Sequence, residues 1–87
     1  MLYMSKFDKN ILGNNLLKVD GHLEWHLSDL LKSRNITKYR LSKLSNIRYD
    51  TICNYCSGNV TLINAEYIKI FCYILDCQIQ DIVQYVD

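Results

Sequence analysis

Six basic side chains between residues 32 and 48 are the most concentrated chemical feature of this sequence. No acidic residue interrupts that stretch, and residues 21–59 as a whole hold six basic and three acidic residues, a net charge of +3. Residues 60–87 hold one basic and four acidic residues, a net charge of −3. This asymmetry indicates that one face of the protein binds a polyanion, although the net charge of the whole chain is only +1. A solvated basic surface without a ligand is the alternative. The basic residues are Lys32, Arg34, Lys38, Arg40, Lys43 and Arg48.

The four cysteines have a spacing that a zinc site can use. Cys53 and Cys56 form a Cys-x-x-Cys pair, and Cys72 and Cys77 follow after 15 intervening residues. Zinc sites of this kind usually take the first pair from a knuckle turn, whereas Cys53 and Cys56 fall within a predicted helix. We therefore expect no metal and no cofactor, and we expect the cysteines to pack as small apolar side chains in and near the core.

Two histidines have a spacing that metal ligands can use. His22 and His26 have the spacing of metal ligands on one helix face, but Glu24 would point away from that face, so the His-Glu-x-x-His pattern of metalloproteases is absent. Surface or half-buried histidines are the better interpretation. No Ser-His-Asp arrangement, glycine-rich phosphate loop or pair of acids in a cleft is evident, so we do not expect an enzyme.

The composition favours one small helical domain. The chain has 87 residues, no proline and three glycines, and about half of its residues are apolar. With so few turn residues and little alternation of apolar and polar residues, an all-β fold is improbable. No apolar run approaches the roughly 20 residues of a membrane span, and the N-terminus lacks a signal peptide, so a cytoplasmic protein with reduced cysteines is predicted.

The apolar periodicity predicts five helices behind an N-terminal arm. The arm, residues 1–20, has uncertain structure with a short strand near Leu16–Val19, and the domain spans residues 21–87. Helices are expected at about residues 22–34, 38–44, 49–56, 65–75 and 79–85. Asp20, Thr37 and Asn64 are placed as N-caps, Asn46 suits a left-handed residue, and Gly58 suits a helix end. Arg34 falls on the same face of the first helix as its leucines, in the last turn, where a cation suits the helix dipole. The expected core residues are Leu23, Leu27, Leu30, Leu31, Leu41, Leu44, Ile47, Ile52, Tyr55, Ile68, Phe71, Cys72, Leu75, Ile82, Val83 and Val86.

The segment from residue 37 to 58 resembles a helix-turn-helix. Thr37 as the first cap, Leu41 and Leu44 inside, Ile47 after a three-residue turn and Thr51-Ile52 in the second helix resemble the Xre/Cro-like (lambda-repressor-like) domains of bacterial and phage regulators. Residues 66–86, EYIKIFCYILDCQIQDIVQYV, are similar to the closing two helices of small Cro-like regulators. The resemblance covers about residues 22–86 and implies an all-α, five-helix DNA-binding domain.

The same resemblance implies which residues contact DNA. Lys38 falls where the family usually has a glutamine on a phosphate, Asn46 replaces the usual turn glycine, and Arg48 replaces the usual Ser/Thr cap. Asn59 stands where the family often has a basic residue. At the base-reading positions, arginine can reach guanine, aspartate can accept from cytosine and asparagine can pair with adenine. The implied base-reading residues are Arg48, Tyr49, Asp50 and Asn54, and the implied phosphate contacts are Thr37, Lys38, Arg40, Lys43 and Ser57.

A second apolar face on the helix at residues 65–75 needs a partner. The N-terminal arm can cover it, but we favour a homodimer interface. This face consists of Tyr67, Ile70, Tyr73 and Ile74. The predicted function is a sequence-specific transcriptional regulator that binds double-stranded DNA as a homodimer on a two-fold site, with no small-molecule substrate and no membrane partner. The alternative is a protein-interaction module on the same fold, such as an antitoxin or inhibitor that binds a protein. The low net charge and Asn59 favour that alternative.

Overall fold

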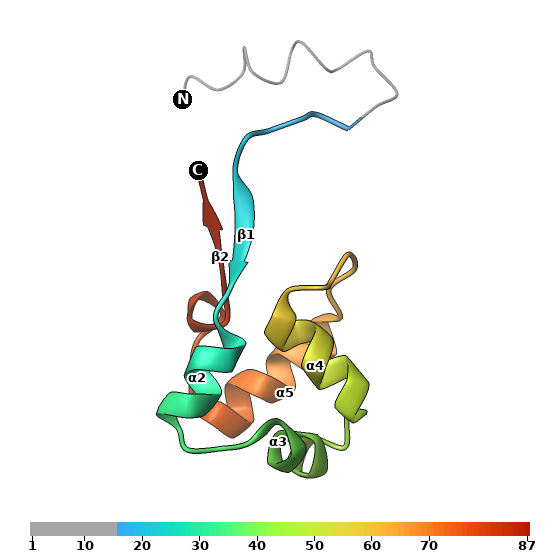
Figure 1. The fold of residues 1–87 in the computed structure, drawn as a ribbon, viewed down its shortest axis with the longest axis vertical. Helices are drawn as coiled ribbons and strands as arrows, with labels where there is room; N and C mark the ends of the chain where they lie inside the picture. The colour runs from blue at the N-terminus through green and yellow to red at the C-terminus, as the bar shows by residue number, and fades with distance from the viewer. Residues whose placement is uncertain (1–15) are drawn as a thin grey trace.

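The computed structural model describes residues 16–87, which form a mostly helical domain with a small strand pair. Figure 1 shows the helices gathered at one end and the two strands rising from them. Residues 1–15 of the predicted arm lie outside the described residues, and residues 16–19, predicted as a short strand, have no regular secondary structure. The elements are β1 (His22–Trp25), α2 (Leu27–Ser33), α3 (Lys38–Ser45), α4 (Tyr49–Ser57), α5 (Ala65–Leu75), the 3₁₀ turn η1 (Ile79–Asp81) and β2 (Val83–Val86).

The strand pair was not predicted from the sequence. β1 and β2 run antiparallel, with His22 opposite Val86 and Trp25 opposite Val83. The predicted helices at residues 22–34 and 79–85 are therefore wrong in part, because residues 22–25 are a strand and residues 79–86 form a 3₁₀ turn followed by a strand. Each strand has only four residues, so the alternation of apolar and polar side chains is too short to recognise in the sequence. The pairing of two segments so far apart in the chain depends on the rest of the fold.

The start of α2 differs from the prediction for the same reason. Asp20 lies before β1 and caps no helix, while His26 occupies the N-cap position of α2 without a side-chain cap hydrogen bond. Leu23, which was expected in the core, is exposed on the strand. Leu27 and Leu31 are buried as predicted, so the apolar face of the helix itself was identified correctly.

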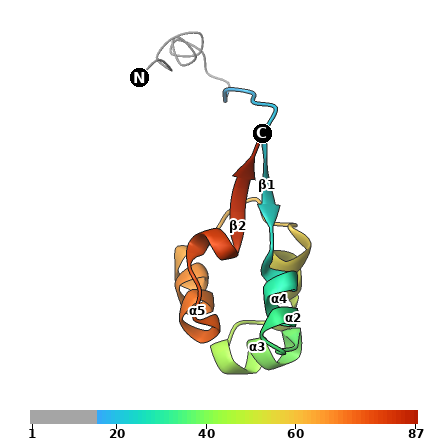
Figure 2. The same cartoon turned by 90° about the vertical axis from the view of Figure 1, so that its left-hand side faces the viewer.

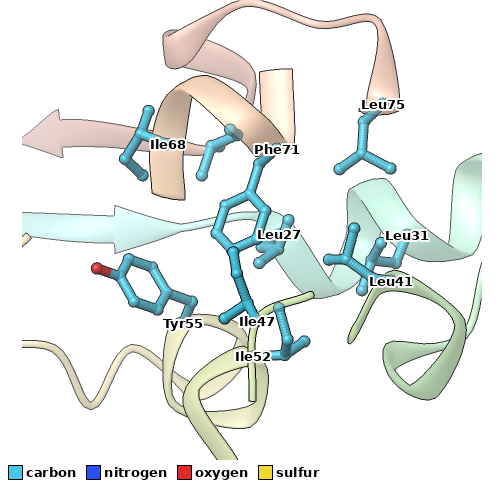
Figure 3. Packing of buried hydrophobic residues seen from close by; sticks show 10 residues of the cluster. Leu27, Leu31, Leu41, Ile47, Ile52, Tyr55, Ile68, Phe71 and Leu75 are labelled. Atoms are coloured by element: carbon cyan, nitrogen blue, oxygen red, sulfur yellow. The ribbon is translucent and has the colours of Figure 1, made fainter. Parts of the chain in front are cut away.

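One compact core joins all four helices to β2. Phe71 of α5 lies at its centre in Figure 3, with Leu27 of α2 and Ile52 of α4 close by. Leu44, predicted to point inward, is instead 48% exposed, because α3 turns only one side, through Leu41, toward the other helices. The buried residues are Leu27, Leu31, Leu41, Ile47, Ile52, Tyr55, Ile68, Phe71, Leu75 and Ile82.

Tyr55 ties α4 to the rest of the domain. Its ring meets Trp25, Phe71 and Tyr67 edge-on, at centroid distances of 5.5, 5.6 and 6.1 Å. Edge-to-face pairs of this kind are favourable beyond the apolar area that they bury. The Tyr55 hydroxyl also accepts a hydrogen bond of 2.9 Å from the backbone N–H of Asn64, the N-cap of α5. One side chain therefore fixes the position of α4 relative to β1 and α5.

Arg34 was expected on the inner face of α2, and its guanidinium reaches the C-terminal end of α5. The Nε of Arg34 donates to the carbonyl oxygen of Leu75 at 2.9 Å, and a terminal nitrogen donates to that of Asp76 at 3.4 Å. A cation at the carboxyl end of a helix satisfies unpaired carbonyls and complements the helix dipole. Arg34 is therefore a structural residue within the basic stretch.

Replacing Arg34 with methionine should lower the free energy of unfolding by about 1–3 kcal/mol, because two carbonyls of the α5 end lose a charged donor. Urea denaturation followed by circular dichroism measures this change. Lys32→Met, in the exposed last turn of α2, is the matched control and should change stability by no more than about 0.5 kcal/mol. Equal effects of the two substitutions would show that the Arg34 contacts do not stabilise the domain.

Candidate nucleic-acid interface

The corner between α3 and α4 has the capping geometry predicted for it. The Thr37 hydroxyl oxygen accepts a hydrogen bond of 3.0 Å from the backbone N–H of Arg40, so Thr37 caps α3. Asn46 adopts the left-handed conformation with φ of 60°, and its N–H donates to the carbonyl oxygen of Ser42 at 2.9 Å. Ile47 then enters the core as predicted. Asparagine tolerates this backbone conformation better than most residues, which is why it can stand in place of glycine.

Two serines that were not predicted as site residues stabilise the turn between α3 and α4. The Ser42 hydroxyl donates to the carbonyl oxygen of Ile47 at 2.5 Å, and the Ser45 hydroxyl oxygen accepts from the N–H of Ile47 at 3.2 Å. Both polar groups of the Ile47 backbone are thus satisfied while its side chain is buried. Serines three residues apart in the last turns of a helix, before a left-handed residue, are the signal that could have identified them.

The exposed side of α4 carries the predicted base-reading residues. Arg48 is the N-cap and makes no side-chain cap hydrogen bond, and Asp50 lies in the first turn. The Arg48 and Asp50 side chains are each 85% exposed, and their charged atoms lie 4.0 Å apart. A surface ion pair of this kind stabilises the fold very little, so both groups remain available to bind a ligand. Asn54 is exposed one turn further along. Gly58, with φ of 85°, ends the helix as predicted.

Tyr49 and the two cysteines of α4 are positioned by their neighbours. A hydrogen bond with Cys53 raises the pKa of the exposed Tyr49 hydroxyl. Burial raises the pKa of the Cys56 thiol, and the Lys38 ammonium opposes that shift. α3 and α4 are in contact, and Lys38 lies at the start of α3.

The remaining cations of α3 are exposed on the same segment. Lys38, Arg40 and Lys43 are all exposed, and the Lys43 ammonium lies 5.2 Å from the centre of the Tyr39 ring. A cation over an aromatic face is held in place by the ring quadrupole. A hollow of about 360 Å³ lies between α2 and the start of α3, and Lys32, Thr37 and Lys38 line it. Ser57, also predicted to touch a phosphate, is exposed at the other end of α4, and its hydroxyl donates to the Asn54 carbonyl oxygen at 3.2 Å.

The predicted dimer residues do not share one environment. Tyr67 is half-buried and meets the Tyr55 ring, whereas Tyr73 is 85% exposed. Ile70 and Ile74 are half-buried at the border of the core. Together with Leu44 of α3, the residues 70, 73 and 74 line a shallow hollow of about 400 Å³ between α3 and α5. The leucine that failed to enter the core therefore enlarges this apolar surface.

The histidines and cysteines that could bind a metal lie in different environments. In the chain from residue 16 onward, no three His, Cys, Asp or Glu side chains are grouped so that they could hold a metal ion. All four cysteines are free thiols, and burial beside Cys72 raises the pKa of Cys77 to about 11. His22 and His26 do not share a helix face, because the strand places both near Glu24, with nitrogen-to-oxygen distances of 3.9 and 3.4 Å. The absence of a metal stays a prediction.

The comparisons with known proteins agree with this corner. A model of the Cro/C1-type HTH DNA-binding domain family matches residues 26–87. This chain belongs to that family. The Cro/C1-type domain here also has the fold of the transcriptional regulator VanUg, as seen in its crystal structure (form II). The structural match covers 84% of this chain and 96% of the VanUg chain, with a TM-score of 0.65 and 20% sequence identity. A comparison with curated proteins finds no match. The pair predicted from the sequence as the helix-turn-helix, α3 and α4, lies within the matched residues.

Among the described residues of the domain, no helix has the length and apolar character to span a membrane.

Proposed function

We propose that this chain is a sequence-specific transcriptional regulator that binds double-stranded DNA as a homodimer on a two-fold site. The observation that carries this proposal is the fixed α3–α4 corner of a Cro/C1-type domain, with an exposed polar α4 and exposed cations on α3. The division into an arm at residues 1–20 and a DNA-binding domain at 21–87 is part of the proposal. No catalytic step, metal or cofactor is required for it.

In this proposal α4 enters the major groove and α3 lies across the phosphate backbone. The major groove is about 12 Å wide and admits one helix, so the angle between the two helices must be fixed before binding. The serine hydrogen bonds at Ile47 fix the turn between the two helices, and the Tyr55 contacts fix α4 relative to β1 and α5. Lys38, Arg40 and Lys43 neutralise phosphates and release counterions, which supplies affinity independent of sequence.

The base-reading assignment follows from side-chain chemistry at the start of α4. Arg48 suits guanine, Asp50 suits the amino group of cytosine, and Asn54 suits adenine. Tyr49 can donate its hydroxyl to a phosphate or pack on a thymine methyl group. Thr37 can also contact a phosphate, because its hydroxyl oxygen accepts the cap hydrogen bond and its proton remains free to donate.

Two surfaces of the described chain can hold the second copy. The hollow between α3 and α5, with Ile70, Tyr73 and Ile74, was predicted from the sequence, and it stays a prediction. Tyr67 contributes less to that surface than expected, because its ring is engaged with Tyr55. The open edge of β2 is the second surface.

Lys38→Ala tests the proposed DNA surface. The substitution should weaken binding to all duplexes alike and lower the slope of log affinity against log salt by roughly one unit, because it removes one phosphate contact. Fluorescence anisotropy with a labelled duplex at several salt concentrations measures both quantities.

Lys69→Ala is the matched control for Lys38. Lys69 lies on α5, pairs with Glu66 at 3.0 Å and is not one of the proposed phosphate contacts, so its removal should leave the salt slope unchanged. An unchanged slope for Lys38→Ala, or an equal change for both variants, would place DNA on another surface. Wild-type binding to duplex that does not depend on salt would contradict the proposed function itself.

A further inference from the structure

The C-terminal end of α5 brings two cysteines together. Asp76 follows the helix in the left-handed conformation, with φ of 50°, and the backbone N–H of Cys77 then donates to the carbonyl oxygen of Cys72 at 3.1 Å. Figure 2 shows the chain turning back after α5 and returning beside that helix toward β2. At a helix end closed by such a hydrogen bond, the side chains of the two bonded residues frequently pack against each other. Here both side chains are thiols.

This helix end gives Cys72 and Cys77 the geometry that a disulfide needs. A disulfide joins residues whose Cα atoms lie roughly 4.4–6.8 Å apart, and a direct backbone hydrogen bond holds two residues at about this separation. Burial raises the pKa of Cys77, and the Cys72 thiol adds to the rise through its charge and a hydrogen bond, so the two thiols are in contact. The bond can therefore close with little movement of the backbone.

The pair is accessible to small molecules. Cys72 and Cys77 are free thiols, both half-buried, and both line an apolar groove of about 530 Å³ beside α5. Burial, the Cys72 thiol and Asp81 of η1 together raise the pKa of Cys77 to about 11, against the opposing effect of the Arg34 guanidinium. Because thiol exchange requires the thiolate, the pair reacts slowly near pH 7 and faster in alkaline solution.

The other two cysteines lack this geometry, although their Cys-x-x-Cys spacing is the one associated with redox motifs. Cys53 and Cys56 both lie inside α4. Side chains three residues apart on a helix have Cβ atoms roughly 5–6 Å apart, whereas a disulfide needs roughly 3.5–4.5 Å. The helix would have to distort before this pair could close. Cys53 is instead hydrogen-bonded to Tyr49.

We propose that Cys72 and Cys77 form a dithiol site, which a low-molecular-weight disulfide oxidises to an intramolecular disulfide at the end of α5. The thiolate of one cysteine attacks a sulfur of the oxidant, forms a mixed disulfide and expels one thiolate. The second cysteine loses its proton, attacks the sulfur of the first cysteine and expels the second thiolate. The pair gives up two electrons and two protons, and the oxidant leaves as two thiols.

The site goes beyond the proposed function and does not depend on it. In a reducing compartment such a disulfide forms transiently, on exposure to an oxidant, and excess thiol opens it again. While closed, it ties the end of α5 covalently to the residue from which the chain continues to η1 and β2. A cross-link also limits the unfolded chain, so the oxidised protein should resist unfolding more than the reduced protein.

Oxidised glutathione added to the reduced full chain tests the site. Trypsin cleaves after Arg48 and Lys69, so the two cysteine pairs fall on separate peptides, residues 49–69 and residues 70–87. After alkylation of the remaining thiols, mass spectrometry follows the loss of two hydrogens from each peptide. The peptide of residues 70–87 should close about tenfold faster or more, because only its pair is preformed. Its rate should rise from about pH 7 to about pH 9 as thiolates form.

The same chain unfolded in urea is the control, because urea removes the helix end and keeps the sequence. The preference for residues 70–87 should then shrink to a few-fold or vanish. Three results in the folded chain would overturn the proposal: equal rates for the two peptides, faster closure of residues 49–69, or glutathione adducts on residues 70–87 without an internal bond. A preference that urea leaves unchanged would also overturn it, since the fold would not be its cause.

Serine variants confirm which thiols react. Cys53→Ser/Cys56→Ser should still form the internal bond, and Cys72→Ser should not. Oxidation of the double variant should move its urea midpoint to a higher concentration, because the new bond constrains the unfolded chain. An unchanged or lower midpoint would show that closure does not fit the helix end, against the proposal. Because these measurements contain no DNA, their failure leaves the DNA-binding proposal standing, and a failure of DNA binding leaves the dithiol site standing.

Discussion

Replacing Phe71 with alanine should remove most of the free energy of unfolding at room temperature. Phe71 is fully buried at the centre of the core, between α2, α4 and α5 (Figure 3). Truncating such a residue costs about 3–5 kcal/mol, from lost apolar burial and from the cavity that remains. A domain of this size has a total stability at the lower end of about 5–15 kcal/mol. The loss therefore approaches the whole free energy of unfolding.

Urea denaturation followed by circular dichroism gives the measurement, with Tyr73→Ala as the control. Tyr73 is an aromatic residue on the same helix and is almost fully exposed, so its removal should change stability by no more than about 0.5 kcal/mol. Similar midpoints for the two variants would contradict the assignment of α5 to the centre of the core.

Replacing Arg48 and Asn54 together with alanine should remove most of the preference for a specific DNA sequence. Each side chain, if it pairs with a base as proposed, contributes about 1–3 kcal/mol of discrimination. The double variant should therefore bind a specific duplex about as weakly as an unrelated one, while its affinity for unrelated duplex falls much less. The difference arises because the phosphate contacts of α3 remain in place.

Competition between a selected duplex and a scrambled duplex measures this change in specificity. Gln80→Ala is the control, because Gln80 is an exposed amide on η1, distant in the chain from the α3–α4 corner. Specificity should be unaffected in that variant. A double variant of Arg48 and Asn54 that retains the wild-type ratio of affinities would show that α4 does not read the bases.

Sequence reasoning succeeded where a signal lies within a few residues. Thr37 and Asn64 cap helices because each side chain accepts a hydrogen bond from an N–H two or three residues later. Asn46 and Gly58 adopt positive φ, which few other residues tolerate. These local preferences gave the three central helices close to their observed ends, and with them the turn between α3 and α4.

Sequence reasoning failed where partners are distant in the chain. The pairing of His22–Trp25 with Val83–Val86 joins the two sides of the domain, and neither strand is long enough to show its own alternation. Arg34 illustrates the same difficulty, because its partners at Leu75 and Asp76 lie more than 40 residues away. Helical periodicity places Arg34 on the inner face of the first helix, but it does not predict that the C-terminal end of α5 lies next to it.

The exposed surface was the least predictable part. Leu44 has the spacing of a core residue. It lies at the surface because the hollow between α3 and α5, which it lines, is open to solvent. The roles of Ser42 and Ser45 depend on the position of Ile47 after the turn, a geometry that exists only once the corner has formed. Once Ile52 and Tyr55 are assigned to the core, the 3.6-residue period of the helix determines which residues of α4 are exposed. The placement of these residues was therefore predictable, and their DNA contacts stay a prediction.

Selection from a pool of random duplexes with the purified full chain tests the central proposal most directly. We expect enrichment of one sequence with two-fold symmetry, whose half-sites lie about one helical turn apart, and loss of that enrichment when Arg48 and Asn54 are replaced. A pool that remains random after repeated rounds, while wild-type protein is folded and Gln80→Ala behaves identically, would contradict sequence-specific DNA binding by this domain.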